Sequence, residues 1–157
     1  MKQDGKRLYQ WTAIDEFSRY RFVYGFEDHT PENSVKFLKL LEAAFPFKIE
    51  AVQTDNGTEF TYRYISEEKE CPFETALREA GIEHRLIPPR TPWHNGKVER
   101  QHRTDELRFY KYMRMFSLED GRKQLAVYQR ESNDHIMTCL GMRSPNQVLE
   151  LYHGVMW

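Results

Sequence analysis

The sequence predicts an α/β fold in which helices flank a mixed β-sheet, and two features of the chain support this prediction. The first is a pair of runs rich in aromatic and β-branched residues, LYQWTAID at 8–15 and YRFVYGF at 20–26, with only the polar EFSR between them. Such runs predict two antiparallel strands. The second is that helical and strand-like patterns alternate after residue 30. Strands followed by alternating helices and strands are typical of α/β proteins.

The chain begins at a predicted hairpin turn. Asp4-Gly5 is a strong signal for a two-residue turn, which requires a strand on each side, yet only Met-Lys-Gln precedes it. We therefore expect the first strand of the sheet to be missing and the core to be truncated at its N-terminus. A missing strand would leave the edge of its neighbour unpaired, and this favours self-association, so we also expect a homo-oligomer.

Helices and strands alternate from Thr30 onward. Thr30 provides an N-cap, a proline follows it, and apolar residues then recur at helical spacing up to Pro46. The run IEAVQT at 49–54 predicts a short buried strand. The segment CPFETALREAGI at 71–82 predicts a helix that ends at Gly81.

The C-terminal half is predicted to be largely helical. One more strand is expected in EHRLIPP at 83–89, where the prolines end it. A charged helical segment then runs from Lys97 to about Met115. Ser117 can cap the next helix, and SPNQ at 144–147 has the form of a capping box for the last one.

Composition limits the classes of function. The 157 residues, 39% of them hydrophobic, are enough for one domain with a core, so we expect a single domain over 1–157. With a net charge of -1, binding to a polyanion would require a local basic patch. No apolar run is long enough to span a membrane, and the first residues lack the apolar centre of a signal peptide. We therefore expect a cytoplasmic protein with no membrane partner.

The segment TDNGTEF at 54–60 contains the first candidate functional residue. Asp55 follows the predicted strand at 49–54, at the end of a strand where open α/β sheets place ligands. However, Asp, Asn and Gly are also the residues typical of turns, so Asp55-Asn56-Gly57 can equally be a simple turn.

The second candidate is Glu99, in TPWHNGKVERQHR at 91–103, where a loop leads into a helix. A carboxylate in the first turns of a helix is stabilised by the helix dipole. Lys97, Arg100 and Arg103 surround it, so an exposed helix start with salt-bridge partners is the simpler interpretation of this segment taken alone.

Positive charge is concentrated between His84 and Arg114. This segment holds eight Lys and Arg residues against three acidic ones. Four aromatic residues are interleaved with them: Trp93, Phe109, Tyr110 and Tyr112. Flat rings can stack on bases or sugars while Arg and Lys bind phosphate oxygens. A basic helix is often only a solvated surface, so the segment alone leaves both interpretations open.

Three stretches together resemble the catalytic core of the DDE transposases and retroviral-type integrases, especially insertion-sequence transposases. They are TAIDEFSRYRFVYGF, AVQTDNGTEF and LREAGIEHRLIPPRTPWHNGKVERQHR, in the order of that family and within residues 7–110. The combination is far more specific than any one stretch. The remaining part, 111–157, is expected to be helical.

The resemblance implies a ribonuclease H-like fold and a site in which three carboxylates hold two divalent metal ions, Mg²⁺ or Mn²⁺. Its second acidic position falls on Asp55 and its third on Glu99, which are thereby implied to be catalytic residues and metal ligands. The family's first Asp would lie on the strand that we expect to be missing. The 43 residues between Asp55 and Glu99 exceed the usual spacing. We place the surplus in a polar surface loop at 61–74.

The implied activity is DNA transposition or integration by metal-dependent strand transfer, in which water and then a freed 3'-hydroxyl attack phosphodiester bonds. The implied partner is duplex DNA, both at the element ends and at the target. The residues implied to contact this DNA are Arg90, Trp93, His94, Asn95, Lys97, Arg100 and Arg103. Because the first acidic position is expected to be missing, we expect weak metal binding and little or no strand transfer by this chain alone.

Two other acidic residues are candidates for the missing position, and two other functions are open. Asp15 ends a predicted strand, but a short polar turn follows it, so we expect Asp15 to cap that turn. Asp4 lies nearer to the missing position, although a chain terminus holds a ligand poorly. The first alternative function is a ribonuclease H-like nuclease. The second is a non-catalytic fragment that binds DNA or a full-length relative and interferes with transposition.

Overall fold

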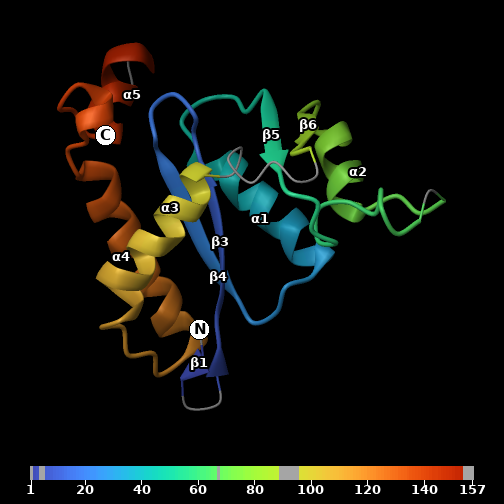
Figure 1. Cartoon of the computed structure of the whole chain (residues 1–157), viewed down its shortest axis with the longest axis horizontal. Coiled ribbons are helices and arrows are strands. Elements are labelled where there is room, and N and C mark those ends of the chain that lie inside the picture. The colour runs from blue at the N-terminus through green and yellow to red at the C-terminus, as the bar shows by residue number, and fades with distance from the viewer. Residues whose placement is uncertain (1, 4–5, 67, 89–95, 154–157) are drawn as a thin grey trace. The chain divides into compact units, whose positions relative to one another are not determined.

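The computed structural model describes residues 2–3, 6–66, 68–88 and 96–153 (Figure 1). The chain divides into two compact units. The first unit combines Met1–Glu27 with Gln101–Trp157, and the second unit is Asp28–Arg100. Each is described by itself below. Among the described helices, none is long and apolar enough to cross a membrane.

The first unit opens with the predicted hairpin. Strand β1 (Lys2–Gln3) pairs antiparallel with β2 (Lys6–Arg7). The turn signal falls on Asp4-Gly5, which lie outside the described residues, and the two strands stand on either side of it. The strand before Asp4-Gly5 supplies only two ladder positions, Lys2 and Gln3, and the expected N-terminal truncation stays a prediction.

Strands β3 (Tyr9–Ile14) and β4 (Arg21–Phe26) form the predicted antiparallel pair. The turn between them is fixed by Asp15, whose Oδ2 accepts hydrogen bonds from the Ser18 main-chain N–H and hydroxyl, both at 2.7 Å. Arg19 closes the turn with a positive φ of 63°. The prediction that Asp15 caps this turn is confirmed.

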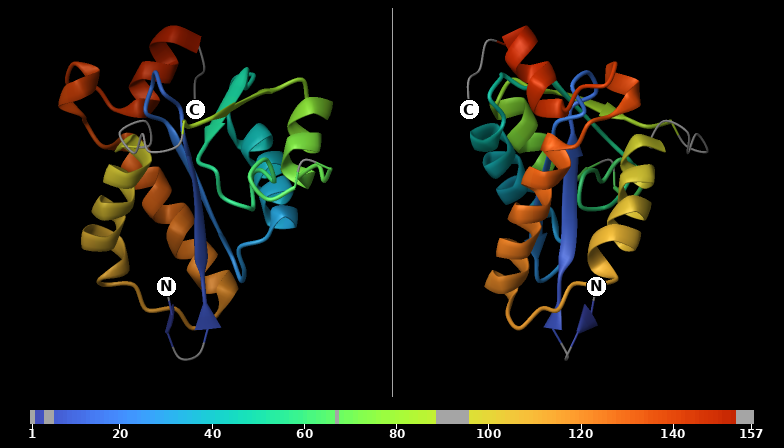
Figure 2. Two further views of the ribbon diagram at one scale, coloured as in Figure 1. Left: turned by 45° about the vertical axis from the view of Figure 1, so that its right-hand side comes forward. Right: turned by 90° about the vertical axis from the view of Figure 1, so that its left-hand side faces the viewer.

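Helix α4 (Leu118–Asp134) runs along the β3–β4 pair (Figure 2). Its N-cap is Ser117, as predicted, and the Ser117 hydroxyl accepts a hydrogen bond from the Asp120 N–H at 3.0 Å. Helix α5 (Pro145–His153) follows a short 3-10 turn, η3 (Thr138–Leu140). Its capping box is confirmed, because Ser144 and Gln147 exchange hydrogen bonds between side chain and main chain.

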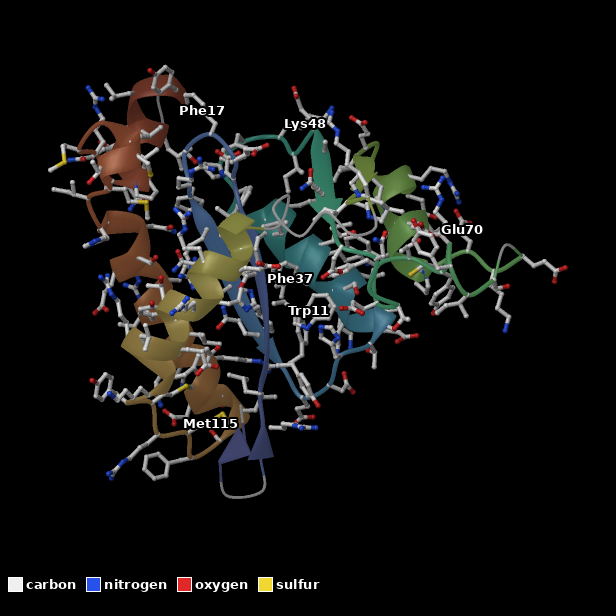
Figure 3. All side chains as sticks on the ribbon, viewed as in Figure 1. Trp11, Phe17, Phe37, Lys48, Glu70 and Met115 are labelled. Carbon is white, nitrogen blue, oxygen red and sulfur yellow. The ribbon has the colours of Figure 1, made fainter. Side chains whose placement is uncertain are left out.

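The core of the first unit lies between these strands and α4. It consists of the buried side chains of Leu8, Val23, Met113, Met115 and Leu125. A second apolar contact joins the strands, where Trp11 on β3 meets Phe26 on β4 edge to face with ring centroids 6.2 Å apart. Trp11 and Met115 are labelled in Figure 3.

A buried ion pair joins β4 to helix α3 (Gly96–Asp105). The guanidinium of Arg21 donates two hydrogen bonds to the Asp105 carboxylate, at 2.9 and 3.0 Å, and both side chains are almost fully buried. Three more side chains donate to this carboxylate: Gln10, Gln101 and Tyr128. Burial by itself would raise the pKa of Asp105, but the hydrogen bonds and charge of Arg21 outweigh burial and lower this pKa. The last turn of α3 is thereby fixed to the first unit.

The second unit contains α1 (Pro31–Ala44), β5 (Ala51–Thr54), α2 (Pro72–Glu79) and β6 (Glu83–Leu86). All four match the elements predicted from the sequence, including the Thr30 N-cap of α1 and the positive φ of Gly81 after α2. Strands β5 and β6 are parallel, so β5, α2 and β6 form a β-α-β unit. The buried core consists of Leu38, Cys71, Phe73, Leu77 and Ile82.

The predicted surface loop at 61–74 is shorter than expected. Tyr64 and Ile65 are exposed, in agreement with the prediction. Cys71 and Phe73, in contrast, are buried in the core, because they begin helix α2 and its apolar face packs inward. Thr61 is buried as well, so the exposed residues of this segment are 63–65 and 68–70 among those described.

Candidate functional site

Asp55 lies directly after β5 and is exposed. Its Oδ1 accepts a hydrogen bond from the Gly57 N–H at 3.1 Å, the geometry of an Asx turn. The turn interpretation of TDNG is therefore confirmed. The turn uses only Oδ1, because Oδ2 accepts no hydrogen bond from any residue that the structure describes.

Two hydrogen bonds connect this turn to the residue that follows strand β6. The Ile87 N–H donates to the Thr54 carbonyl, and the Asn56 amide donates to the Ile87 carbonyl, both at 3.0 Å. These bonds hold Asp55 at the carboxyl end of the parallel β5–β6 pair. In α/β sheets this is the edge at which ligands bind.

Glu99 lies in the first turn of α3 and is exposed. Within the described part of the chain its carboxylate makes no hydrogen bond or ion pair, although Arg103 lies one turn further along the helix. An exposed helix start is thus what the structure shows here, and the salt-bridge partners of that interpretation stay a prediction. The carboxylate faces solvent near the positive end of the helix dipole.

Asp55 and Glu99 both belong to the second unit. Each has a carboxylate oxygen that accepts no hydrogen bond from a described residue, and carboxylate oxygens are the ligands that Mg²⁺ prefers. Among residues 2–3, 6–66, 68–88 and 96–153, no group of three or more His, Cys, Asp or Glu side chains is placed to hold a metal ion. The structure therefore offers two separate candidate ligands.

The residues predicted to contact DNA are divided between described and undescribed parts of the chain. Arg90, Trp93, His94 and Asn95 lie outside the described residues. Lys97, Arg100 and Arg103 lie on α3, and the side chains of Arg100 and Arg103 are exposed. Two of the predicted cations are thus accessible on this helix.

Two of the predicted stacking residues pack inside the first unit. Phe109 and Tyr110 belong to a π-helical turn, η2 (Glu106–Tyr110), which follows α3. The Phe109 ring stacks on Tyr128 with centroids 4.6 Å apart, and the Tyr110 hydroxyl donates to Gln10. The proposal that these rings contact nucleic acid is corrected, because the π-turn directs them to the core. Tyr112 is exposed.

A polar network lies next to Asp55 and has no signal in the sequence. His84 Nε2 lies 2.8 Å from the Thr54 hydroxyl, and that hydroxyl donates to the Asp55 carbonyl oxygen at 2.9 Å. On the other side of the imidazole, Nδ1 lies 3.9 Å from Glu74. No pattern in the sequence signals this contact, because it depends on the register between two strands that are separated by a helix.

Two models of one family match the chain. A model of the integrase core domain matches residues 1–92, and a second integrase core domain model matches residues 80–145. The first match alone covers more than half of the chain.

Relatives with curated descriptions come from a virus and from plant transposons. The chain is 29% identical over 140 residues to a putative integrase, ORF3, of Spiroplasma virus SpV1-C74, covering 83% of this chain and 36% of that protein. It is 34% identical over 116 residues to the retrovirus-related Pol polyprotein from transposon TNT 1-94 of Nicotiana tabacum, covering 73% and 8%. The chain thus spans about a third of the viral relative and less than a tenth of the polyprotein.

Two solved structures share the fold. One chain of the simian T-cell lymphotropic virus intasome in complex with PP2A regulatory subunit B56 gamma matches with a TM-score of 0.74, covering 94% of this chain and 50% of that one. The catalytic core domain of BIV integrase matches with a TM-score of 0.68, covering 94% and 89%. Both are 21% identical to this chain, so the likeness concerns the fold, which is the predicted mixed α/β, ribonuclease H-like fold. Together with the family models, these findings show that the chain belongs to the integrase core domain family.

Proposed function

We propose that this chain takes part in DNA integration or transposition by metal-dependent strand transfer, with Asp55 and Glu99 as catalytic carboxylates. The observation that carries the proposal is the position of Asp55. It lies at the carboxyl end of a parallel strand pair, held by a turn that uses only one of its two carboxylate oxygens. Family membership connects this position to DNA chemistry.

The donor set suits a hard divalent cation. Asp55 Oδ2 and the Glu99 carboxylate would hold Mg²⁺ or Mn²⁺, which take oxygen ligands. A bound ion of this kind stabilises negative charge on a phosphoryl group and activates the attacking oxygen. The part played by the chain itself is to present two exposed carboxylates, of which Asp55 Oδ2 and the Glu99 oxygens have no partner among the described residues.

Helix α3 supplies the proposed contact to DNA. Arg100 and Arg103 are exposed on it, and Lys97 lies one turn before Arg100. Arg90, Trp93, His94 and Asn95 precede this helix in the sequence and complete the proposed DNA-binding set. Arg and Lys bind phosphate oxygens without reading sequence, so this contact would orient duplex DNA.

We further propose that metal binding and strand transfer by this chain alone are weak. Asp55 and Glu99 are two carboxylates, whereas the family resemblance implies three, and each missing anionic ligand removes favourable charge from a cation site. We assign Asp15 to the β3–β4 turn instead, because its Oδ2 accepts two hydrogen bonds from Ser18. A homo-oligomer is part of the same proposal.

Calorimetric titration with Mn²⁺ tests the ligand assignment. The variants are Asp55→Asn and Glu99→Gln, and the matched control is Glu42→Gln, which removes one exposed negative charge from α1. We expect weak binding in the parent and in the control, and no binding in the two site variants. Equal affinity in all four proteins would refute the assignment.

A joining assay separates the possible activities. Duplex DNA ends and an RNA–DNA hybrid are offered to the parent chain with Mn²⁺, and products are compared with those of Asp55→Asn. Slow joining of DNA that is lost in the variant supports strand transfer. Cleavage of the hybrid alone would indicate a nuclease, and DNA binding without metal binding would indicate a non-catalytic DNA-binding chain.

A further inference from the structure

His84, on β6, faces the end of β5. Val52 pairs with His84 and Thr54 pairs with Leu86, so the side chains of His84 and Thr54 lie on one face of the sheet in diagonal positions. Thr54 is buried and His84 is half-buried. Their polar atoms, Oγ1 and Nε2, are 2.8 Å apart.

The hydrogen atoms in this contact can be assigned from the chemistry of the groups. The Thr54 hydroxyl has one hydrogen and donates it to the Asp55 carbonyl oxygen, which can only accept. His84 must therefore donate from Nε2 to the Thr54 oxygen. Nε2 therefore carries a hydrogen, and in the neutral ring Nδ1 is then the unprotonated nitrogen.

The surroundings keep His84 neutral and in place. Burial lowers the pKa of His84, and the nearby Glu74 carboxylate opposes this without reversing it. The imidazole contacts the Phe73 ring edge to face, with centroids 5.7 Å apart. Glu74 is itself held by a 2.7 Å hydrogen bond from Thr61. The ring orientation is therefore set by α2 and by the segment before it.

We propose that His84 is a positioning residue for Asp55 and acts through the Thr54 hydroxyl. The chain of hydrogen bonds runs from the imidazole to the hydroxyl and on to the Asp55 main chain, immediately before the turn that holds Oδ1. The proposal rests on the proposed function to the extent that Asp55 binds a metal ion. The hydrogen-bond chain itself is independent of that role.

Nitrogen NMR of the histidine rings tests the hydrogen-bond chain directly. His84→Gln identifies the His84 signals at pH 7.5, because they disappear in this variant. We expect the tautomer with hydrogen on Nε2 in the parent, and a change in its shifts in Thr54→Val but not in Thr54→Ser, which keeps the hydroxyl. The tautomer with hydrogen on Nδ1, or shifts that are unchanged in Thr54→Val, would overturn the proposal.

Metal binding tests the positioning role. His84→Phe cannot donate to Thr54, whereas the amide of His84→Gln can, so we expect a loss of Mn²⁺ affinity of about tenfold or more in His84→Phe and recovery in His84→Gln. Thermal unfolding of both variants is measured in parallel. Equal affinity in both variants would overturn the positioning role, because a purely structural residue would change only the unfolding temperature.

A third readout separates this inference from the proposed function. The Gly57 amide donates to Asp55 Oδ1, so its chemical shift reports the placement of that carboxylate without metal. We expect the shift to move in His84→Phe and to stay near the parent value in His84→Gln. If the parent binds no Mn²⁺ and Gly57 behaves as expected, the metal assignment fails and the positioning holds. If Gly57 does not move, the positioning fails.

Discussion

At the scale of single residues, two charged side chains are buried in the described part of the first unit. Arg21 and Asp105 are both almost fully removed from water, and each is paired by two hydrogen bonds. Removing one member leaves the other charged and buried. Replacing both with apolar residues removes that cost.

We therefore predict that Asp105→Ala lowers the free energy of unfolding by about 3 to 5 kcal/mol, as measured by urea unfolding. The double variant Arg21→Met/Asp105→Leu is expected to recover most of this loss. If the double variant were as unstable as Asp105→Ala, the cost would come from the lost network with Gln10 and Tyr128, and our account of an uncompensated charge would be wrong.

Substitutions of Asp15 test whether this residue only caps a turn or also binds metal. Asp15→Ala removes the acceptor of both Ser18 hydrogen bonds, so we predict a loss of about 1 to 3 kcal/mol in the free energy of unfolding. Asp15→Asn keeps one side-chain oxygen and should lose less. Neither change should alter Mn²⁺ affinity in calorimetry. A fall in that affinity in both variants would give Asp15 a role at the metal site.

At the scale of elements, helix α4 depends on its N-cap. The Ser117 hydroxyl satisfies the Asp120 N–H, one of the unpaired donors in the first turn. We predict that Ser117→Ala lowers the free energy of unfolding by about 1 kcal/mol, whereas Ser117→Asp, which also caps, leaves it nearly unchanged. Chemical unfolding followed by circular dichroism measures both variants. A stable Ser117→Ala protein would show that the packing of α4 on β4 outweighs its cap.

Elements with a local signal could be predicted from the sequence, and contacts between distant segments could not. The caps at Thr30, Ser117 and Ser144 and the turn at Asp55 follow from residues a few positions apart, so each was found. The π-turn at 106–110 has no comparable signal, which is why Phe109 was assigned to an exposed helix.

Two side-chain contacts within the units could not be predicted from the sequence for the same reason. Arg21 meets Asp105 across 84 positions of sequence, and Thr54 meets His84 across 30. Each contact depends on how the strands and helices pack in the folded chain, and neither composition nor residue spacing determines that packing. The roles proposed for Asp55 and Glu99 rest on the family resemblance, because Asp55 alone indicates only a turn and Glu99 alone only a helix start.

At the scale of the whole molecule, each unit contains a buried group that responds to acid in its own pH range. In the second unit, burial lowers the pKa of His84 below its ordinary value of 6.5. In the first unit, the pKa of Asp105 is lowered below 3.8: burial alone would raise it, but the hydrogen bonds and charge of Arg21 outweigh burial. In both cases the unfolded chain takes up protons more readily than the folded chain, so stability falls on acidification.

We predict that His84 and Asp105 lower the stability in two successive pH ranges as the pH falls. Between pH 7.5 and 5.0 the free energy of unfolding should fall because His84 gains a proton on unfolding, and His84→Gln should show a smaller fall over the same range. Below pH 3.8 a second loss should follow as the acid titrates Asp105, and this loss should be smaller in Arg21→Met/Asp105→Leu.

Urea unfolding of the parent and both variants at pH 7.5, 5.0 and 3.0 measures the two losses. The comparison is made within each protein, so the direct cost of each substitution cancels. If His84→Gln loses as much stability as the parent between pH 7.5 and 5.0, His84 already accepts a proton in the folded chain. Its imidazole would then donate to Glu74 from Nδ1, and the neutral donor to Thr54 would have to be abandoned.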